Sequence, residues 1–161
     1  MATNPYAAPT ARVADTGTEA AAPALWNPNA AASWSLIFSP AFGAFLHMLN
    51  WRALGDQQKA AAAKTWFVVS LAMLLVYLGL AVILPDSKAA DGLSRAVGLA
   101  YLLTWYFAAG RPQAQLVKEK YGADYPRKGW GKPILIGIGA MVGYIIIAII
   151  VGVAIAVAQG H

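Results

Sequence analysis

Residues 134–158 form a continuous stretch of about 25 residues that contains no charged side chain. A helix rises about 1.5 Å per residue, so this stretch would extend roughly 37 Å, which exceeds the ~30 Å hydrocarbon core of a bilayer. A globular domain of this size does not need a helix that is apolar on every side. The stretch therefore predicts a transmembrane helix, with lipid around much of the chain.

The composition agrees with several such helices. Of the 161 residues, 59% are hydrophobic and 12% are charged, whereas about 25% are charged in a typical soluble domain. The absence of cysteine excludes disulfides, thiolate metal sites and cysteine nucleophiles. We interpret the net charge of +5 as a determinant of membrane orientation and not as a nucleic-acid-binding surface. The expected partners are the lipid bilayer and either another membrane protein or further copies of this chain.

We predict an all-α membrane protein with three transmembrane helices, one short interfacial or re-entrant helix and a disordered N-terminal tail. Residues 1–30 are rich in Ala, Pro, Thr and Asn, and such a tail buries too little apolar surface to offset its ordering entropy. Residues 31–55 form the short apolar segment. Residues 56–161 form the membrane domain, with spans at about 65–84, 93–109 and 134–158.

The apolar segment is too short to be read as an ordinary span. Residues 34–49 would reach only about 24 Å as a helix, and Pro40 and Gly43 interrupt them. We prefer a helix that lies at the cytoplasmic boundary or dips partly into the membrane. Alternatively, Pro40 occupies the first turn of a helix over 41–53, with Ser39 as its N-cap and residues 34–38 leading into it. The residues that characterise this segment are Trp34, Pro40, Phe42, Gly43, His47 and Trp51.

Basic residues predict the orientation. Most Lys and Arg lie in residues 50–64 and 110–133, whereas residues 85–92 hold one lysine. Short basic loops stay in the cytoplasm, so three spans place the C-terminus on the outer side. The N-terminus is cytoplasmic if residues 34–49 do not cross, and outside if they do.

The longer basic loop has two possible roles. Its basic residues are Arg111, Lys118, Lys120, Arg127, Lys128 and Lys132. Orientation alone accounts for them, and the alternative is that they bind anionic lipid or a partner protein.

Small residues recur in the last predicted span. Gly139 and Gly143 are four residues apart, and Ala148 and Gly152 follow with the same spacing. Small residues at this interval let two helices approach closely. They predict either packing within the bundle or a face for a partner helix or a second copy of the chain.

The middle of each predicted span contains no Asp, Glu, Lys, Arg or His, and Arg95 lies at the edge of one span. Pumps, ion-coupled carriers and intramembrane proteases need such groups, so we expect no catalytic residue, no cofactor site and no metal site. His47 is the one histidine before the C-terminal residue. A metal site needs several ligands, so we expect His47 to hydrogen-bond a neighbour on the small face with Ser39 and Gly43; a two-histidine heme site would need a second chain.

Three segments resemble those of small, functionally uncharacterised inner-membrane proteins of Gram-negative bacteria. They are residues 4–9 (NPYAAP), residues 34–47 (WSLIFSPAFGAFLH) with 50–55 (NWRALG), and residues 121–133 (YGADYPRKGWGKP). The resemblance implies a bacterial inner membrane, and therefore a periplasmic C-terminus. It implies no known activity, and it carries over no catalytic residues.

The resulting functional hypothesis is a non-catalytic multi-pass protein that binds another membrane component, in an accessory, assembly or immunity role. The alternative is a channel or small-solute conduit formed by an oligomer, although a polar stripe along a span is not evident. An interfacial enzyme using Asp124, Tyr125, Lys128 or His47 is disfavoured, because no motif fixes the geometry of these residues.

Overall fold

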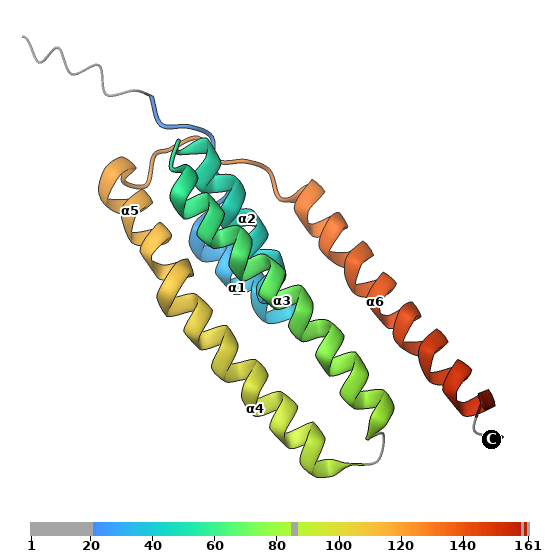
Figure 1. The fold of residues 1–161 in the computed structure, drawn as a ribbon. Coiled ribbons are helices and arrows are strands. Elements are labelled where there is room, and N and C mark those ends of the chain that lie inside the picture. Colours follow the sequence, from blue (N-terminus) through green and yellow to red (C-terminus); the bar gives the residue numbers. More distant parts are fainter. Residues whose placement is uncertain (1–20, 85–86, 159, 161) are drawn as a thin grey trace, which may run out of the picture.

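The computed structural model describes residues 21–84, 87–158 and 160, and this part of the chain is all α-helical, as predicted (Figure 1). The prediction of a disordered tail falls mainly on residues 1–20, which lie outside the described residues. The helices, in chain order, are α1 (Pro28–Phe38), α2 (Pro40–Ala53), α3 (Gln57–Ile83), α4 (Lys88–Trp105), the π-helical segment η1 (Tyr106–Gly110), α5 (Arg111–Tyr121) and α6 (Gly131–Ala158).

Two of the described helices, α3 and α6, are long and apolar enough to cross a membrane. Helix α3 covers the predicted span 65–84 except its last residue, and α6 contains the predicted span 134–158. The predicted span at 93–109 falls in α4 and η1. Helix α4 does not meet the same criterion, because its 18 residues include Lys88, Asp91 and Arg95 in the first half. Its crossing therefore stays a prediction.

The apolar segment folds as two helices, so the expectation of one short helix is wrong. Helices α1 and α2 meet at Ser39 and pack side by side as a hairpin, in which the His47 ring reaches the Pro28 carbonyl. The alternative interpretation is partly right. Pro40 opens α2 and Ser39 occupies the cap position, but the Ser39 side chain makes no cap hydrogen bond, and residues 34–38 are the end of α1. A proline starts a helix readily because its N–H is not needed there.

The folded region begins earlier than the predicted boundary at residue 30. Leu25 is fully buried against Val117 and Tyr125. Its N–H donates to the Pro126 carbonyl (3.0 Å), and the Lys128 N–H donates to the Leu25 carbonyl (2.9 Å). This short parallel bridge joins segments about 100 residues apart, which is why local composition did not indicate it.

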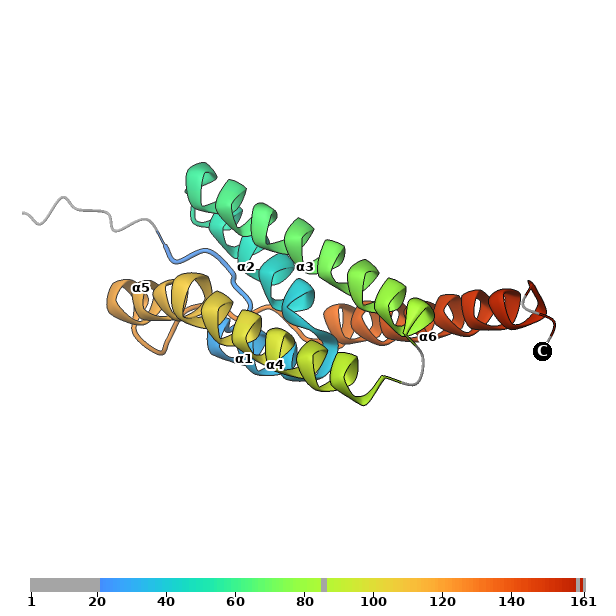
Figure 2. The same cartoon turned by 60° about the horizontal axis from the view of Figure 1, so that its bottom comes forward.

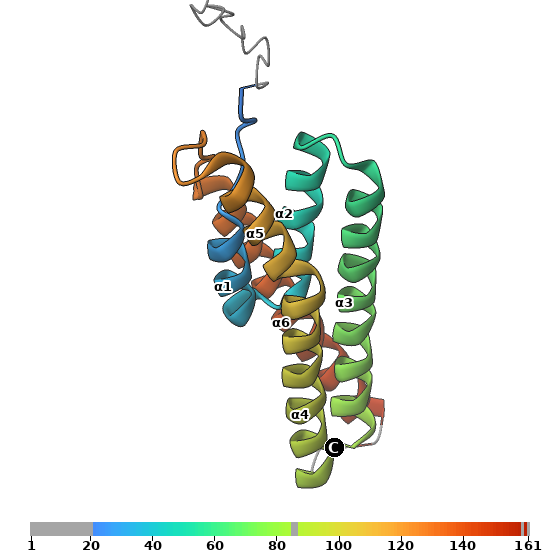
Figure 3. The same cartoon turned by 90° about the vertical axis from the view of Figure 1, so that its left-hand side faces the viewer.

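The short helices gather at one end of the molecule. Figure 3 shows α3 and α4 side by side, with α1, α2 and α5 toward one end of this pair. The path from α4 through η1 to α5 is continuously helical, and it ends where Gly122 adopts a φ of 66°, a positive value that glycine adopts without steric cost. Helix α6 lies at the edge of the bundle, and Figure 2 shows its C-terminal part extending away from the short helices.

Candidate functional site

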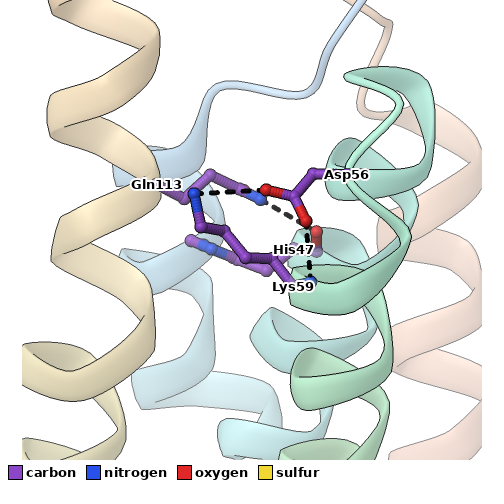
Figure 4. Close-up of polar contacts among 4 residues, drawn as sticks. All are labelled: His47, Asp56, Lys59 and Gln113. Carbon is purple, nitrogen blue, oxygen red and sulfur yellow. Dashed lines mark hydrogen bonds and ion pairs between the residues drawn. The ribbon is translucent and has the colours of Figure 1, made fainter.

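A buried polar cluster links α2 to α5. His47, Asn50 and Gln113 are all buried, and the Gln113 side-chain N–H donates to the His47 carbonyl (2.9 Å; Figure 4). The Asn50 side-chain amide donates to the Trp26 backbone carbonyl (2.8 Å) and to the side-chain Oε1 of Gln113 (3.3 Å), and its own Oδ1 accepts from the Trp26 backbone N–H (3.0 Å). Buried amides that are bonded in this way fix the register of the segments that they join. The cluster therefore anchors the start of the folded chain to α2 and α5.

Sequence reasoning missed Asn50 and Gln113 as structural residues. The available signal was weak, since each is a single uncharged amide near an apolar segment. Figure 4 also shows the cap of α3, where Asp56 accepts from the Lys59 N–H (2.9 Å) and pairs with its ammonium group (3.2 Å). That contact is exposed and separate from the buried cluster.

His47 is a structural histidine, although its partner differs from the expected one. Its Nε2 lies 3.2 Å from the Pro28 carbonyl across the hairpin, so this nitrogen donates and is not free to bind a metal. Its edge meets the Trp105 ring, with 5.5 Å between the ring centroids. Burial lowers the pKa of His47 from 6.5 to about 4, so the ring is neutral at physiological pH. Among the described residues, no three His, Cys, Asp or Glu side chains are grouped to hold a metal.

Gly43 makes room for Trp105. The Trp105 side chain is fully buried with Ala32 and Ala44. A Cβ atom added at Gly43 would lie 2.5 Å from Cη2 of Trp105 and closer still to Oγ of Ser35. Trp105 is therefore a core residue that packs between the hairpin and η1.

Trp34, Phe42 and Trp51 of the apolar segment serve packing. The Trp34 ring stacks on Phe38 (5.6 Å) and approaches Trp130 (6.5 Å), and Phe42 approaches Phe38 (5.0 Å). Trp51 is buried with Met48 of α2 and two alanines of α3. The segment's aromatic side chains thus hold the hairpin against α3 and the start of α6.

The predicted basic loop is spread over three parts of the structure. Arg111, Lys118 and Lys120 lie on α5, Arg127 and Lys128 lie in the following loop, and Lys132 lies in the first turn of α6. Several of these cations lie over aromatic rings, such as Lys128 over Trp26 (4.3 Å) and Arg127 over Tyr125 (5.4 Å). These contacts hold some of the cationic groups against aromatic side chains of the folded protein. The sequence alone did not indicate them.

The four small residues predicted as one face of α6 do not share a face. At about 100° per residue, Ala148 lies roughly 140° around the helix from Gly143. A Cβ atom added at Gly139, Gly143 or Gly152 would meet nothing within 4 Å. These glycines do not serve packing within the bundle, so that alternative is wrong. The glycine that does is Gly137, where an added Cβ would lie 3.1 Å from both Phe38 and Phe42.

An apolar groove lies between the hairpin tip, α3 and α6. Its volume is about 410 Å³, and aromatic and aliphatic side chains dominate its walls, including Phe42, Phe45, Phe67, Leu71 and Met141. This volume lies within the ~300–1,000 Å³ typical of ligand pockets. At the end of the groove formed by Leu74 and Tyr144, the Tyr144 hydroxyl donates to the Leu74 carbonyl (3.1 Å). This hydrogen bond joins α6 to α3.

Comparison of the chain with protein-family models, with curated proteins and with solved structures finds no match.

Proposed function

We propose that this chain is a multi-pass protein of a bacterial inner membrane that binds another membrane protein through α6 and performs no catalysis itself. Three spans, formed by α3, α4 with η1, and α6, place the basic segments in the cytoplasm and the C-terminus in the periplasm. The exposed apolar surface of α3 and α6 supports insertion, because water would surround those side chains otherwise.

The placement of α4 as a span is supported by its attachment to α3. The Tyr101 hydroxyl donates to the Trp66 carbonyl (3.1 Å) and lies 2.9 Å from the Ser70 hydroxyl. The two helices run side by side (Figure 3), so α4 reaches the same depth as α3. Its charged residues lie at the end of α4 next to the 85–86 connection, where long side chains can extend to the headgroups.

The short length of the α1–α2 hairpin and its covered turn support the interpretation of this region as a re-entrant segment. The two helices rise about 16 and 21 Å, which is less than the ~30 Å core. Non-helical backbone is tolerated at membrane depth when protein covers it. The turn at Ser39 and Pro40 is covered by Ser70, Met73 and Tyr77, which line a small cavity with it. Both ends of the hairpin then lie in the cytoplasm.

The proposed partner role is based on one observation: most side chains of α6 do not pack against the rest of the protein. Beyond Tyr144, large apolar side chains on different sides of the helix are exposed, with Val153 at 57%, Ile150 at 60% and Val157 at 70%. Open space over Gly139 and Gly143 leaves room for a second helix to approach. An accessory, assembly or immunity role would each use such a face.

The conduit alternative gains no support from the described residues. The hydroxyl groups of Ser70, Thr104 and Tyr144 each donate to a backbone carbonyl, at 2.8, 2.8 and 3.1 Å. Groups that are already bonded in this way do not present a polar stripe to a solute.

A pull-down from membranes in mild detergent tests the partner role. We expect tagged wild-type chain to recover a membrane protein or an untagged copy of itself, and Gly143→Leu to recover at least about tenfold less, because a bulky side chain keeps the second helix away. Gly79→Leu on α3 is the matched control, since an added Cβ there also meets nothing within 4 Å. Equal recovery by both variants, or no specific partner for the wild type, would count against the proposal.

A further inference from the structure

We infer that the apolar groove binds one acyl chain of an anionic phospholipid, whose phosphate lies at the proposed cytoplasmic end of the groove, beyond which Lys64 and Lys132 are found. The inference depends on the membrane insertion proposed above, and it does not depend on the partner protein. Its basis is that each of two walls of the groove begins with a lysine at the proposed cytoplasmic end.

The α3 wall is headed by Lys64. Phe67, Leu71 and Leu74 line the groove, and they follow Lys64 at intervals of three and four residues. Residues at that spacing occupy one side of a helix. Lys64 is exposed, so its ammonium group lies one turn above the apolar wall.

The α6 wall is headed by Lys132. Ile136, Ala140 and Tyr144 line the groove and continue from Lys132 in steps of four residues, which form one inclined row on a helix surface. Lys132 is also exposed. The hydrogen bond between Tyr144 and Leu74 aligns the two helices, which run in the same direction (Figure 1).

Counting back from this bond gives the depth of the lysines. Lys64 lies ten residues before Leu74 and Lys132 lies twelve before Tyr144, which correspond to about 15 and 18 Å. Half of the hydrocarbon core is also about 15 Å. With the bond near the midplane, as the proposed orientation has it, both lysines therefore lie near the cytoplasmic edge of the hydrocarbon core.

Charge complementarity then selects the occupant. The ion pair found among the described residues joins Lys59 to Asp56. No carboxylate of the described residues therefore pairs with Lys64 or Lys132. A basic residue near the membrane surface attracts anionic lipid electrostatically. A zwitterionic lipid would fill the apolar groove equally well but would gain less from the lysines.

Native mass spectrometry of the full chain in mild detergent tests the inference, with phosphatidylglycerol and phosphatidylethanolamine of identical acyl chains as the probes. We expect one phosphatidylglycerol to bind at least about tenfold more tightly than phosphatidylethanolamine. The double variant Lys64→Gln/Lys132→Gln should lose this preference. Lys118→Gln/Lys120→Gln on α5, with the same change of net charge away from the groove, should keep it.

A second variant tests the acyl chain separately. Ala140→Trp places a ring in the groove and should lower the affinity for both lipids, whereas Ala154→Trp, on the exposed C-terminal half of α6, should not. Equal loss in both lysine pairs, no preference between the lipids, or unchanged binding by Ala140→Trp would overturn the inference. Loss of a protein partner in Ala140→Trp with lipid binding intact would also overturn it, because the groove would then hold protein. Recovery of the chain in the soluble fraction would instead refute the membrane proposal itself.

Discussion

At the scale of single residues, the interior of this protein depends on a few close contacts between unlike side chains. Trp105 fits because residue 43 has no side chain, and His47 stays neutral because the fold removes it from water and gives its Nε2–H a carbonyl. Asn50 and Gln113 satisfy each other and the adjacent backbone. Each of these groups would be costly to bury alone, so they stabilise the fold as a set.

Replacing Gly43 by alanine should destabilise the protein by about 1–3 kcal/mol, because overpacking forces Trp105 and Ser35 to move. Thermal unfolding in detergent, followed by circular dichroism, measures the effect. Gly79→Ala is the control, since its added methyl group meets nothing, and Gly43→Ala combined with Ser35→Ala and Trp105→Phe should recover part of the loss. Equal melting temperatures for the Gly43 and Gly79 variants would show that the contact is not tight.

At the scale of elements, the α1–α2 hairpin is the least regular part of the fold. Ser39 has φ 88° and ψ 159°, a region that is essentially reserved for glycine and costs a larger residue about 1–3 kcal/mol. The Ser39 side chain does not cap α2 in return. The surrounding contacts, including the tilted rings of Phe38 and Phe42, hold this turn in place.

Ser39→Gly should therefore stabilise the protein by about 1 kcal/mol, since the relief of backbone strain exceeds the added entropy of the unfolded chain. Ser39→Ala keeps the backbone strain and removes only a hydroxyl that makes no cap hydrogen bond. The stability of this variant should therefore remain close to that of the wild type. Thermal unfolding of the three proteins in one detergent gives the comparison. A lower melting temperature for Ser39→Gly than for Ser39→Ala would contradict the assignment of strain to this turn.

At the scale of the whole molecule, polar and aromatic contacts concentrate at one end. The bridge between Leu25 and Arg127, the buried amides and the start of α3 all lie there, whereas α3, α4 and α6 extend away from it (Figure 1). In the proposed orientation this end faces the cytoplasm. Because both ends of the hairpin lie on one side of the membrane, the N-terminal segment is then on the same side as α5.

Single-cysteine labelling can test this orientation, because the chain has no native cysteine. A thiol reagent that cannot cross the inner membrane should label Lys88→Cys when it is added to cells with a permeabilised outer membrane. It should label Ala24→Cys and Lys120→Cys only after the inner membrane is opened. Labelling of Ala24→Cys from outside would mean that residues 34–49 cross the membrane.

Much of the coarse architecture was predictable because it depends on local properties. The helical class, the long apolar helices and the glycine that ends α5 follow from hydrophobic length and from the backbone preferences of single residues. The hairpin was not predictable, because a proline within an apolar run is compatible with a bent helix, a helix start or a turn. Trp105 lies near the end of an apolar run, where a tryptophan often marks a membrane boundary, and only its neighbours in the structure place it in the core.

The sequence by itself determined which segments are apolar enough for lipid and how charge is divided among the loops, since both are properties of consecutive residues. The tertiary structure decided the hairpin, the buried amides and the apolar groove. These features join residues that lie far apart in the chain: Asn50 reaches Trp26 over 24 positions, Gln113 reaches His47 over 66, and Tyr144 reaches Leu74 over 70. Such contacts depend on how the helices pack against one another, and packing is a property of the folded chain.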